Sequence, residues 1–204
     1  MLTYERKGCT VRTKMTYDEM KEALKKRLKP KRFTHSLGVA ETAVFLARRF
    51  GVDEEKARIA GLLHDCGREY EDSALIHEAE RRGIPVSDVE RAMPILLHAY
   101  IGARRVREVY GIKDAAIEQA IWRHSVGAED MTDLDKVIWF ADMIEPGRAY
   151  PEVERLRRLS REASLDAMVL EGLTQTILFV VREGHLIHPV TVAARNALLL
   201  KGST

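Results

Sequence analysis

Helix start and stop signals recur along almost the whole chain and constrain its fold more than any other feature. Thr16 with Glu19, and Ser87 with Glu90, have the spacing of a capping box, in which side chains satisfy free backbone N–H groups of a first helical turn. Pro30 suits the first turn of a helix, and apolar residues follow it at three- and four-residue spacing. Strand-like alternation and hairpin signals are nearly absent. The sequence therefore predicts an all-α fold.

These signals divide the chain into a series of expected helices. We expect them from residue 16 to before Pro30, from 30 to a stop at 51, from 53 into 64, at 72–82, from 87 to before 94, from 94 to 111, from 114 to near 124, from 133 into 142, at 151–161, from 164 to 184, and within 185–200. The apolar stripe of the helix that starts after Ser164 is expected to be buried up to Gly184.

The chain length suits one domain. With 204 residues and 46% hydrophobic content, the sequence can bury one good core but is short for two. We expect a single helical domain over residues 16–204, and a disordered leader over residues 1–15 or a true start at Met15.

Charge and cysteine content exclude several classes of protein. A net charge near +2 gives no electrostatic case for a nucleic-acid or membrane partner. No apolar run approaches the ~20 residues that span a bilayer, and the charged N-terminus is unlike a signal peptide. Cys9 and Cys66 lack the spacing of a zinc finger or a disulfide framework. We therefore expect a protein of the reducing cytoplasm.

The segment GLLHDCGRE, residues 61–69, places His64 and Asp65 side by side after an apolar run. Adjacent side chains leave a helix in different directions, so both reach one metal only where the helix ends, and Gly67 predicts such an end. A single His-Asp dipeptide is more often a surface pair. The interpretation of His64 and Asp65 as metal ligands is supported by further candidate ligands on or at the ends of expected helices, namely His35, His98, His124 and Asp142.

This set of side chains suits metal-assisted phosphate chemistry. Histidine and carboxylate ligands without cysteine favour an open catalytic site for Fe, Mn, Zn or Ni. Asp65 has two oxygens that can bridge two ions, and such a pair stabilises an in-line phosphoryl displacement. Arg32, Arg68 and Arg148 lie close in sequence to the candidate ligands, and guanidinium groups bind phosphate bidentately. The sequence therefore predicts hydrolysis of a phosphate ester or anhydride.

The ordered series H…HD…H…H…D resembles the HD-domain metal phosphohydrolases. The segments RFTHSLGVAETA, AGLLHDCGRE, WRHSVG, FADMIEPGR and IHPVTVAARN resemble the YqeK branch, known as symmetrical diadenosine tetraphosphate hydrolases, and the resemblance covers about residues 16–200. It implies a single-domain HD helical bundle with metal ligands at His35, His64, Asp65, His98, His124 and Asp142. It also implies catalytic roles for Asp65 and Arg68, and substrate contacts at Arg32, Arg68, Ser125, Arg148, His188 and Thr191.

Two positions depart from the pattern of these proteins. Arg68 stands where many HD proteins have Lys; it keeps the charge for a phosphate contact but is a poor proton donor. Ser125 stands where the branch often has Thr, and it keeps the hydroxyl group.

The activity implied by the resemblance is hydrolysis of diadenosine tetraphosphate to two ADP with one or two divalent ions. We expect iron, with Mn, Ni, Co and Zn as alternatives. Other interpretations stay open: an HD enzyme acting on nucleoside monophosphates or guanosine polyphosphates, or a nucleotide-sensing or interaction module without turnover. His98 and His124 either bind a second ion or contact substrate phosphate. The apolar face of residues 192–200 either packs internally or forms a homodimer.

Overall fold

The computed structural model describes residues 15–202, which are mostly helical and contain no strand. This confirms the all-α prediction, whereas nearly all of the leader predicted over residues 1–15 lies outside the described residues. The elements are α1 (Tyr17–Lys25), α2 (Pro30–Phe50), α3 (Glu54–Leu63), η1 (Cys66–Glu69), α4 (Asp72–Arg81), α5 (Asp88–Ala92), η2 (Pro94–Leu96), α6 (Leu97–Tyr110), α7 (Ala115–Arg123), α8 (Asp133–Ile144), α9 (Val153–Glu162), α10 (Leu165–Arg182) and α11 (Pro189–Lys201), where η marks a 3₁₀ helix.

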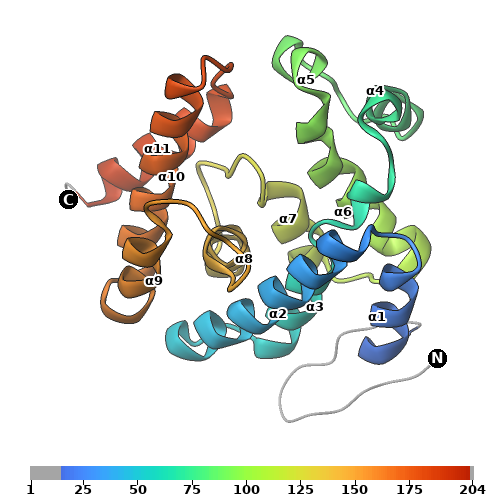
Figure 1. Ribbon diagram of the computed structural model, residues 1–204, viewed down its shortest axis with the longest axis horizontal. Coiled ribbons are helices and arrows are strands. Elements are labelled where there is room, and N and C mark those ends of the chain that lie inside the picture. The colour runs from blue at the N-terminus through green and yellow to red at the C-terminus, as the bar shows by residue number, and fades with distance from the viewer. Residues whose placement is uncertain (1–14, 203–204) are drawn as a thin grey trace.

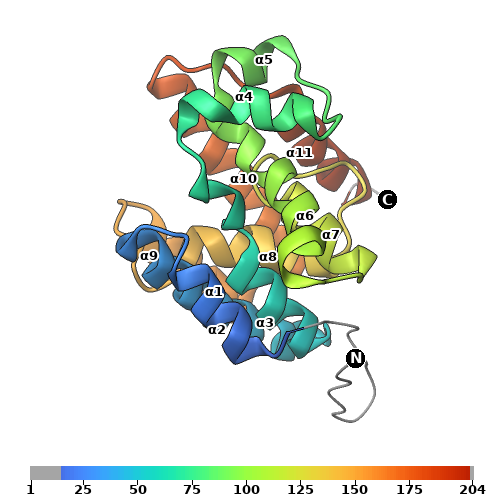
Figure 2. The same ribbon diagram turned by 90° about the vertical axis from the view of Figure 1, so that its right-hand side faces the viewer.

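Helix α8 is the centre around which the others pack. It contacts α2, α3, α7, α9 and α10, and Figure 1 shows it near the middle of the fold. Val137, Ile138 and Phe140 of α8 are fully buried. Helices α4 and α5 lie at the opposite end of the molecule from α1, α2 and α3 in both Figure 1 and Figure 2. None of the helices between residues 15 and 202 combines the length and apolar character that a bilayer span requires.

The predicted capping residues lie at the starts of the expected helices, except that the N-cap of α8 lies one residue earlier than predicted. Glu19 accepts a hydrogen bond from the backbone N–H of Thr16 at 2.6 Å, which completes the first capping box. Helix α8 begins at Asp133 as predicted. Its N-cap, however, is Thr132, whose hydroxyl accepts from the backbone N–H of Asp135 at 3.2 Å. A Thr-x-x-Asp pair therefore caps this helix.

The apolar stripe of α10 is fully buried only in the first half of the helix, so the prediction that it stays buried up to Gly184 is wrong for the second half. Leu165, Met168 and Leu173 are buried, and Gly172 lies against the ring of Trp139 on α8. In the second half, Ile177 and Val180 of the predicted stripe are only half-buried, and the neighbouring Phe179 is 60% exposed. In Figure 1 the second half of α10 stands beside α11 and away from the rest of the bundle, so the core ends before this part of the helix.

The predicted helix end at Gly67 is also wrong. Helix α3 ends at Leu63, and Gly67 lies within η1 without a positive φ. A Cβ at Gly67 would stand 2.1 Å from the carbonyl oxygen of His98 and 3.0 Å from the backbone nitrogen of Gly102. Glycine is required here because η1 approaches the backbone of α6 closely. That approach brings Asp65, just before η1, beside His98.

We predict that Gly67→Ala destabilises the protein by about 3 kcal/mol, because the added methyl overlaps the backbone of α6. Gly102→Ala is the matched control from the same interface. Its Cβ would meet neighbouring atoms at 3.4 Å or more, so its cost should stay below about 1 kcal/mol. Urea unfolding curves of the two variants measure the difference, and equal free energies of unfolding would contradict this account of Gly67.

Candidate metal centre

Five helices and one helix junction bring the six candidate ligands to one place. His35 lies on α2 and Asp142 near the end of α8. His64 caps the C-terminus of α3, and Asp65 follows it at the start of η1. The remaining two are His98, in the first turn of α6, and His124, the C-cap of α7. Residues up to 107 positions apart in the sequence thus meet in one buried cluster.

The carboxylate of Asp65 joins two pairs of histidines. Its Oδ2 lies 3.7 Å from Nε2 of His35 and 3.5 Å from Nε2 of His64. Its Oδ1 lies 3.1 Å from Nε2 of His98 and 3.9 Å from Nε2 of His124. The Oδ1 of Asp142 completes the first group, 2.9 Å from Nε2 of His35 and 3.8 Å from Nε2 of His64. One carboxylate therefore serves two adjacent donor groups.

Hydrogen bonds at Nδ1 fix the tautomer of three histidines. The Nδ1 atoms of His64 and His124 lie 2.7 Å and 2.6 Å from the carbonyl oxygens of Gly61 and Ile121, and that of His98 contacts the carbonyl of Ile95. A carbonyl only accepts, so each Nδ1 must carry the proton. In the neutral rings, each Nε2 then presents a lone pair to the cluster, which is the arrangement found in histidine metal ligands.

The inward nitrogens face one another closely. Nε2 of His35 and Nε2 of His64 are 3.2 Å apart, and Nε2 of His98 and Nε2 of His124 are 3.1 Å apart. Two lone pairs at this separation repel each other unless a proton or a metal cation lies between or beside them. His35, His64 and Asp142 form one set of donor atoms within 4.8 Å of one another, and His64, Asp65 and His124 form a second. The donor atoms therefore fit a divalent cation, and the two sets overlap at His64.

Charge and burial act differently on the groups of the cluster. Burial lowers the pKa of His64, and burial together with the nearby His64 and His98 lowers the pKa of His124 to about 3, so both rings are neutral at pH 7. Burial opposes ionisation of Asp142. The hydrogen bond from His35 and the charges around it nevertheless hold the pKa of that carboxyl well below its usual range. Burial likewise opposes the charged form of His35, but its bonds to Asp142 and Glu145 raise the pKa of that ring above its usual value. The centre thus keeps ionised carboxylates beside the neutral rings of His64 and His124, and a metal cation would replace the proton on the inward nitrogen of His35.

Glu145 is a member of the site that the sequence analysis did not single out. Its Oε1 lies 3.0 Å from Nδ1 of His35, and its Oε2 accepts from the backbone N–H of Gly147 at 2.6 Å. The carboxylate is buried against Gly38, where a Cβ would stand 2.6 Å from Oε2. The available signal was its position three residues after Asp142, which places both side chains on one side of the end of α8.

Helix α9 holds the turn that carries Glu145. Arg157 donates to the carbonyl oxygens of Ile144, Glu145 and Arg148 at 3.0, 2.7 and 3.0 Å. These carbonyls belong to the end of α8 and the turn after it, where the helix no longer satisfies them. The charged helix α9 therefore fixes the edge of the site.

Three arginines surround the side of the centre that opens to solvent. Arg32 Nη1 lies 2.8 Å from Asp65 Oδ2, Arg68 Nε lies 3.4 Å from Asp65 Oδ1, and Arg148 contacts the carboxylate of Asp142. Their side chains are 35%, 26% and 35% exposed, and that of Asp142 is 22% exposed, whereas Asp65 is nearly inaccessible. The solvent-facing side of the centre, called its mouth below, is thus lined with guanidinium groups, and the histidines lie in its buried part.

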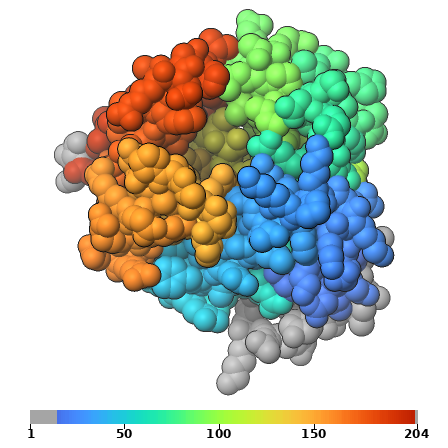
Figure 3. Space-filling model, viewed as in Figure 1, coloured from blue at the N-terminus to red at the C-terminus, as the bar shows by residue number. Residues whose placement is uncertain are grey.

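The other expected substrate contacts lie around the start of α11. Ser125 follows His124 directly and is partly exposed. Thr191 is buried and donates its hydroxyl to the carbonyl of Val126 at 3.0 Å. His188 caps α11 and its Nε2 lies 3.2 Å from Oε1 of Glu90, on α5. Thr191 thereby joins α11 to the loop after His124. Figure 3 shows a hollow between the red C-terminal helices and the green segments of the middle of the chain.

Comparisons with known proteins agree with this geometry. The family model described as HD domain matches residues 32–147, a segment that holds all six candidate ligands. Proteins named bis(5'-nucleosyl)-tetraphosphatase, symmetrical, are similar along most of the chain. That of Halalkalibacterium halodurans is 36% identical over 180 residues, 88% of this chain and 95% of the relative, and that of Bacillus subtilis is 34% identical over 185 residues, 91% and 98%.

A solved structure is similar to the whole described fold. It comes from Clostridium acetobutylicum and is described as an HD superfamily hydrolase involved in NAD metabolism. At 38% sequence identity it superposes with a TM-score of 0.87 and covers 92% of this chain and 98% of its own. The similarity therefore extends beyond the matched segment to α1 and to the C-terminal helices. Taken with the match over residues 32–147, it shows that the chain belongs to the HD-domain family.

Proposed function

We propose that the protein is a metal-dependent hydrolase that splits diadenosine tetraphosphate and related dinucleoside polyphosphates symmetrically, releasing two ADP from the former. The observation that carries the proposal is the carboxylate of Asp65, which offers one oxygen to each of two histidine pairs. Such a bridge suits two ions that act on one phosphoryl group. Similarity to relatives named for this activity supports the substrate.

Two divalent ions fit the donor groups. His35, His64, Asp65 and Asp142 would hold one, and His98, His124 and Asp65 the other. The donors are nitrogen and oxygen without sulfur, which suits iron, and Mn, Ni, Co or Zn as alternatives. When bound, the ions supply Lewis acidity to the phosphoryl oxygens and activate water at neutral pH.

The arginines at the mouth would bind the polyphosphate. Arg32 and Arg68 each use one nitrogen on Asp65, so most of the five N–H donors of each guanidinium remain available for phosphate oxygens. Arg148, which is bonded to the carboxylate and the backbone carbonyl of Asp142, would also contact the polyphosphate. These groups orient the chain and stabilise charge that develops on the phosphoryl oxygens.

The reaction consumes one water molecule. The water oxygen bonds to one of the two central phosphorus atoms, and the bond from that phosphorus to the oxygen bridging the central pair breaks. One ADP leaves with the electron pair, and the other carries the oxygen from water. Arg68 keeps its proton at neutral pH, so its role is to hold phosphate. ADP is a weakly basic leaving group and needs little protonation.

The segment around α11 would complete the nucleotide site. We assign Ser125 a contact with substrate, because it directly follows His124 and is partly exposed. His188 and Thr191 hold the start of α11 through Glu90 and Val126. In this proposal they place the start of α11 beside the substrate.

Location and assembly are also proposals. The buried free thiol of Cys66 suits a reducing cytoplasm. A homodimer would cover the exposed apolar residues of α10 and α11, which are Leu178, Phe179, Val181, Val190, Val192, Leu199 and Leu200.

Product analysis tests the proposed activity. We expect metal-loaded protein incubated with diadenosine tetraphosphate to release ADP alone, with ¹⁸O from labelled water in half of the ADP. AMP together with ATP would contradict the symmetrical cut. Absence of turnover with Fe, Mn, Ni, Co and Zn would instead support a sensing or interaction module.

We predict that Asp65→Ala loses both ions and all measurable turnover, because the carboxylate serves both donor groups. Elemental analysis of the purified variant measures the metal directly. Asp18→Ala, at a position on α1 whose side chain is 86% exposed, is the control and should retain both. A full metal complement in Asp65→Ala would show that the centre is misplaced.

Glu145→Gln should weaken metal binding about 10- to 100-fold, because an amide orients His35 and supports its basicity less well than a carboxylate. Metal affinity measured by competition with a chromophoric chelator gives the effect apart from turnover. Glu162→Gln, at an exposed position at the end of α9, should leave it unchanged. An unaltered affinity in Glu145→Gln would remove Glu145 from the centre.

A further inference from the structure

A largely buried hydrogen bond joins α11 to α5. Nε2 of His188, the N-cap of α11, lies 3.2 Å from Oε1 of Glu90 on α5, and both side chains are at least nine-tenths buried. Helix α11 otherwise packs mainly against α10. The bond therefore ties the start of α11 to the green side of the hollow in Figure 3.

Both ring nitrogens of His188 are used in this arrangement. Nδ1 accepts a hydrogen bond from the backbone N–H of Val190 at 3.2 Å, so it carries no proton. In the neutral ring the proton is then on Nε2, which donates it to Glu90. His188 thus has no free nitrogen to offer a phosphate or a base, and its polar atoms hold the start of α11 instead.

Glu90 is itself fixed by further hydrogen bonds. Its Oε2 accepts from the backbone N–H of Ser87 at 2.7 Å and from the hydroxyl of the same residue. The hydroxyl of Tyr100, on α6, is another partner. Burial opposes ionisation of Glu90, but the bonds from Ser87, His188 and Tyr100 lower the pKa of its carboxyl. One buried carboxylate thus joins α5, α6 and α11.

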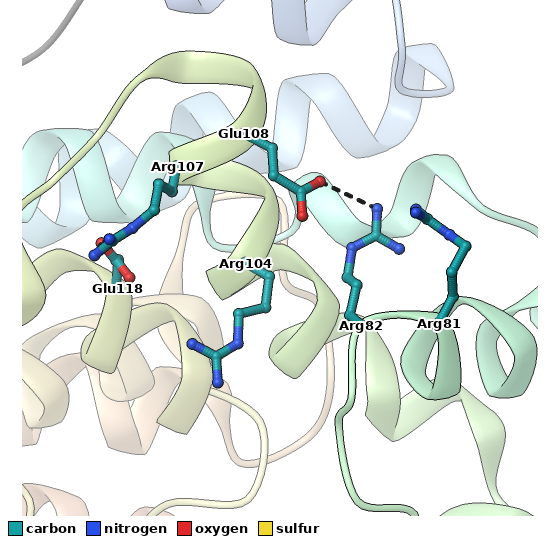
Figure 4. Close-up of a pocket in the computed structure, with 6 residues that line it drawn as sticks. All are labelled: Arg81, Arg82, Arg104, Arg107, Glu108 and Glu118. Carbon is teal, nitrogen blue, oxygen red and sulfur yellow. Dashed lines mark hydrogen bonds and ion pairs between the residues drawn. The ribbon is translucent and has the colours of Figure 1, made fainter.

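The side chains behind this carboxylate lead to the candidate metal centre. Tyr100 lies two residues after His98 on α6, and its ring packs on that of Trp122 with 4.5 Å between ring centroids. Trp122 lies two residues before His124, and the guanidinium carbon of Arg104, drawn in Figure 4, is 5.4 Å from the centroid of its ring. The carboxylate is therefore connected through packed side chains to the turns that carry two candidate ligands.

The start of α11 is also seated on the loop that follows His124. Thr191 donates its hydroxyl to the carbonyl of Val126, and a Cβ on Gly127 would stand 3.2 Å from that of Ala194. These contacts place the start of α11 beside a candidate metal ligand.

The side chains at the start of α11 differ in chemistry from those at the mouth of the centre. Residues 184–194 contain no Lys, Arg, Asp or Glu, and Leu186 and Val190, on either side of His188, are exposed. The mouth, by contrast, carries guanidinium groups. The start of α11 therefore suits the uncharged nucleoside part of a nucleotide better than its phosphates.

We propose that Glu90 is a positioning residue for nucleoside recognition: through His188 it holds the start of α11 against the nucleoside part of the substrate. This inference rests on the proposed function and deepens it, because it separates recognition of the nucleoside from recognition of the phosphate chain. Glu90 does not itself touch the substrate. The arginines at the mouth bind phosphate whether or not the bond between α5 and α11 is present.

Titration calorimetry of the metal-loaded protein with ADP and with inorganic pyrophosphate tests this inference. His188→Asn keeps a side-chain acceptor for the N-terminus of α11 but is too short to reach Glu90. Glu90→Gln offers one acceptor oxygen where the carboxylate has two. We expect each variant to bind ADP about tenfold more weakly and to bind pyrophosphate as the wild type does.

Ser87→Ala is the matched control, because it removes a hydroxyl bonded to the other oxygen of Glu90 and leaves the bond to His188 in place. It should bind both ligands as the wild type does. The double variant Glu90→Gln with His188→Asn should lose no more affinity for ADP than the weaker-binding single variant, since both changes break one bond. Additive losses, equal weakening of both ligands, or wild-type affinity for ADP in both single variants would overturn the inference.

Turnover distinguishes this inference from the proposed function. With diadenosine tetraphosphate, Glu90→Gln should raise KM and leave kcat within about twofold, because the metal centre is unaltered. A lower kcat at unchanged KM would contradict the role of Glu90. If the wild type does not hydrolyse diadenosine tetraphosphate but the variants differ in ADP binding as expected, the proposed activity fails and the role of Glu90 stands. Failure of the wild type to bind ADP would overturn both.

Discussion

The ionised carboxylate of Asp65 is the group on which the arrangement of the site depends. Burying a charge is costly unless it is paired, and Asp65 is paired on both sides, with Arg32 near one oxygen and His98 near the other. To place those partners, α2, α3 and α6 must meet at one point. The close approach of η1 to α6 at Gly67 makes that meeting possible. The pairing of Asp65 therefore depends directly on how α2, α3 and α6 pack.

Position along a helix explains how each histidine is oriented. His64, His98 and His124 lie at or near helix ends, and each ring bonds to the carbonyl three residues before it. His35 lies inside α2, where helical bonding already occupies the preceding carbonyls. Its ring instead takes the carboxylate of Glu145 from α8. The need for a partner from another helix thus follows from the mid-helix position of His35.

The histidines and the arginines of the site differ in their exposure to solvent. The histidines of the centre are buried, whereas the arginines at its mouth keep part of each side chain in solvent. An exposed guanidinium retains donors for a ligand, while a buried one such as that of Arg82 serves the fold. Differences in exposure, more than in residue type, divide ligand-binding arginines from structural ones.

The sequence alone determined the helices and the ordered series of ligand candidates, because caps and apolar spacing act within a few residues. Thr16 and Asp114 could be identified as caps for this reason. Only the tertiary structure decided which side chains meet. Glu145 reaches His35 across 110 positions, and no local pattern encodes that contact. The exposure of Phe179 on an apolar helix was likewise decided by where the core ends. Such contacts depend on how whole helices pack, which short-range signals do not specify.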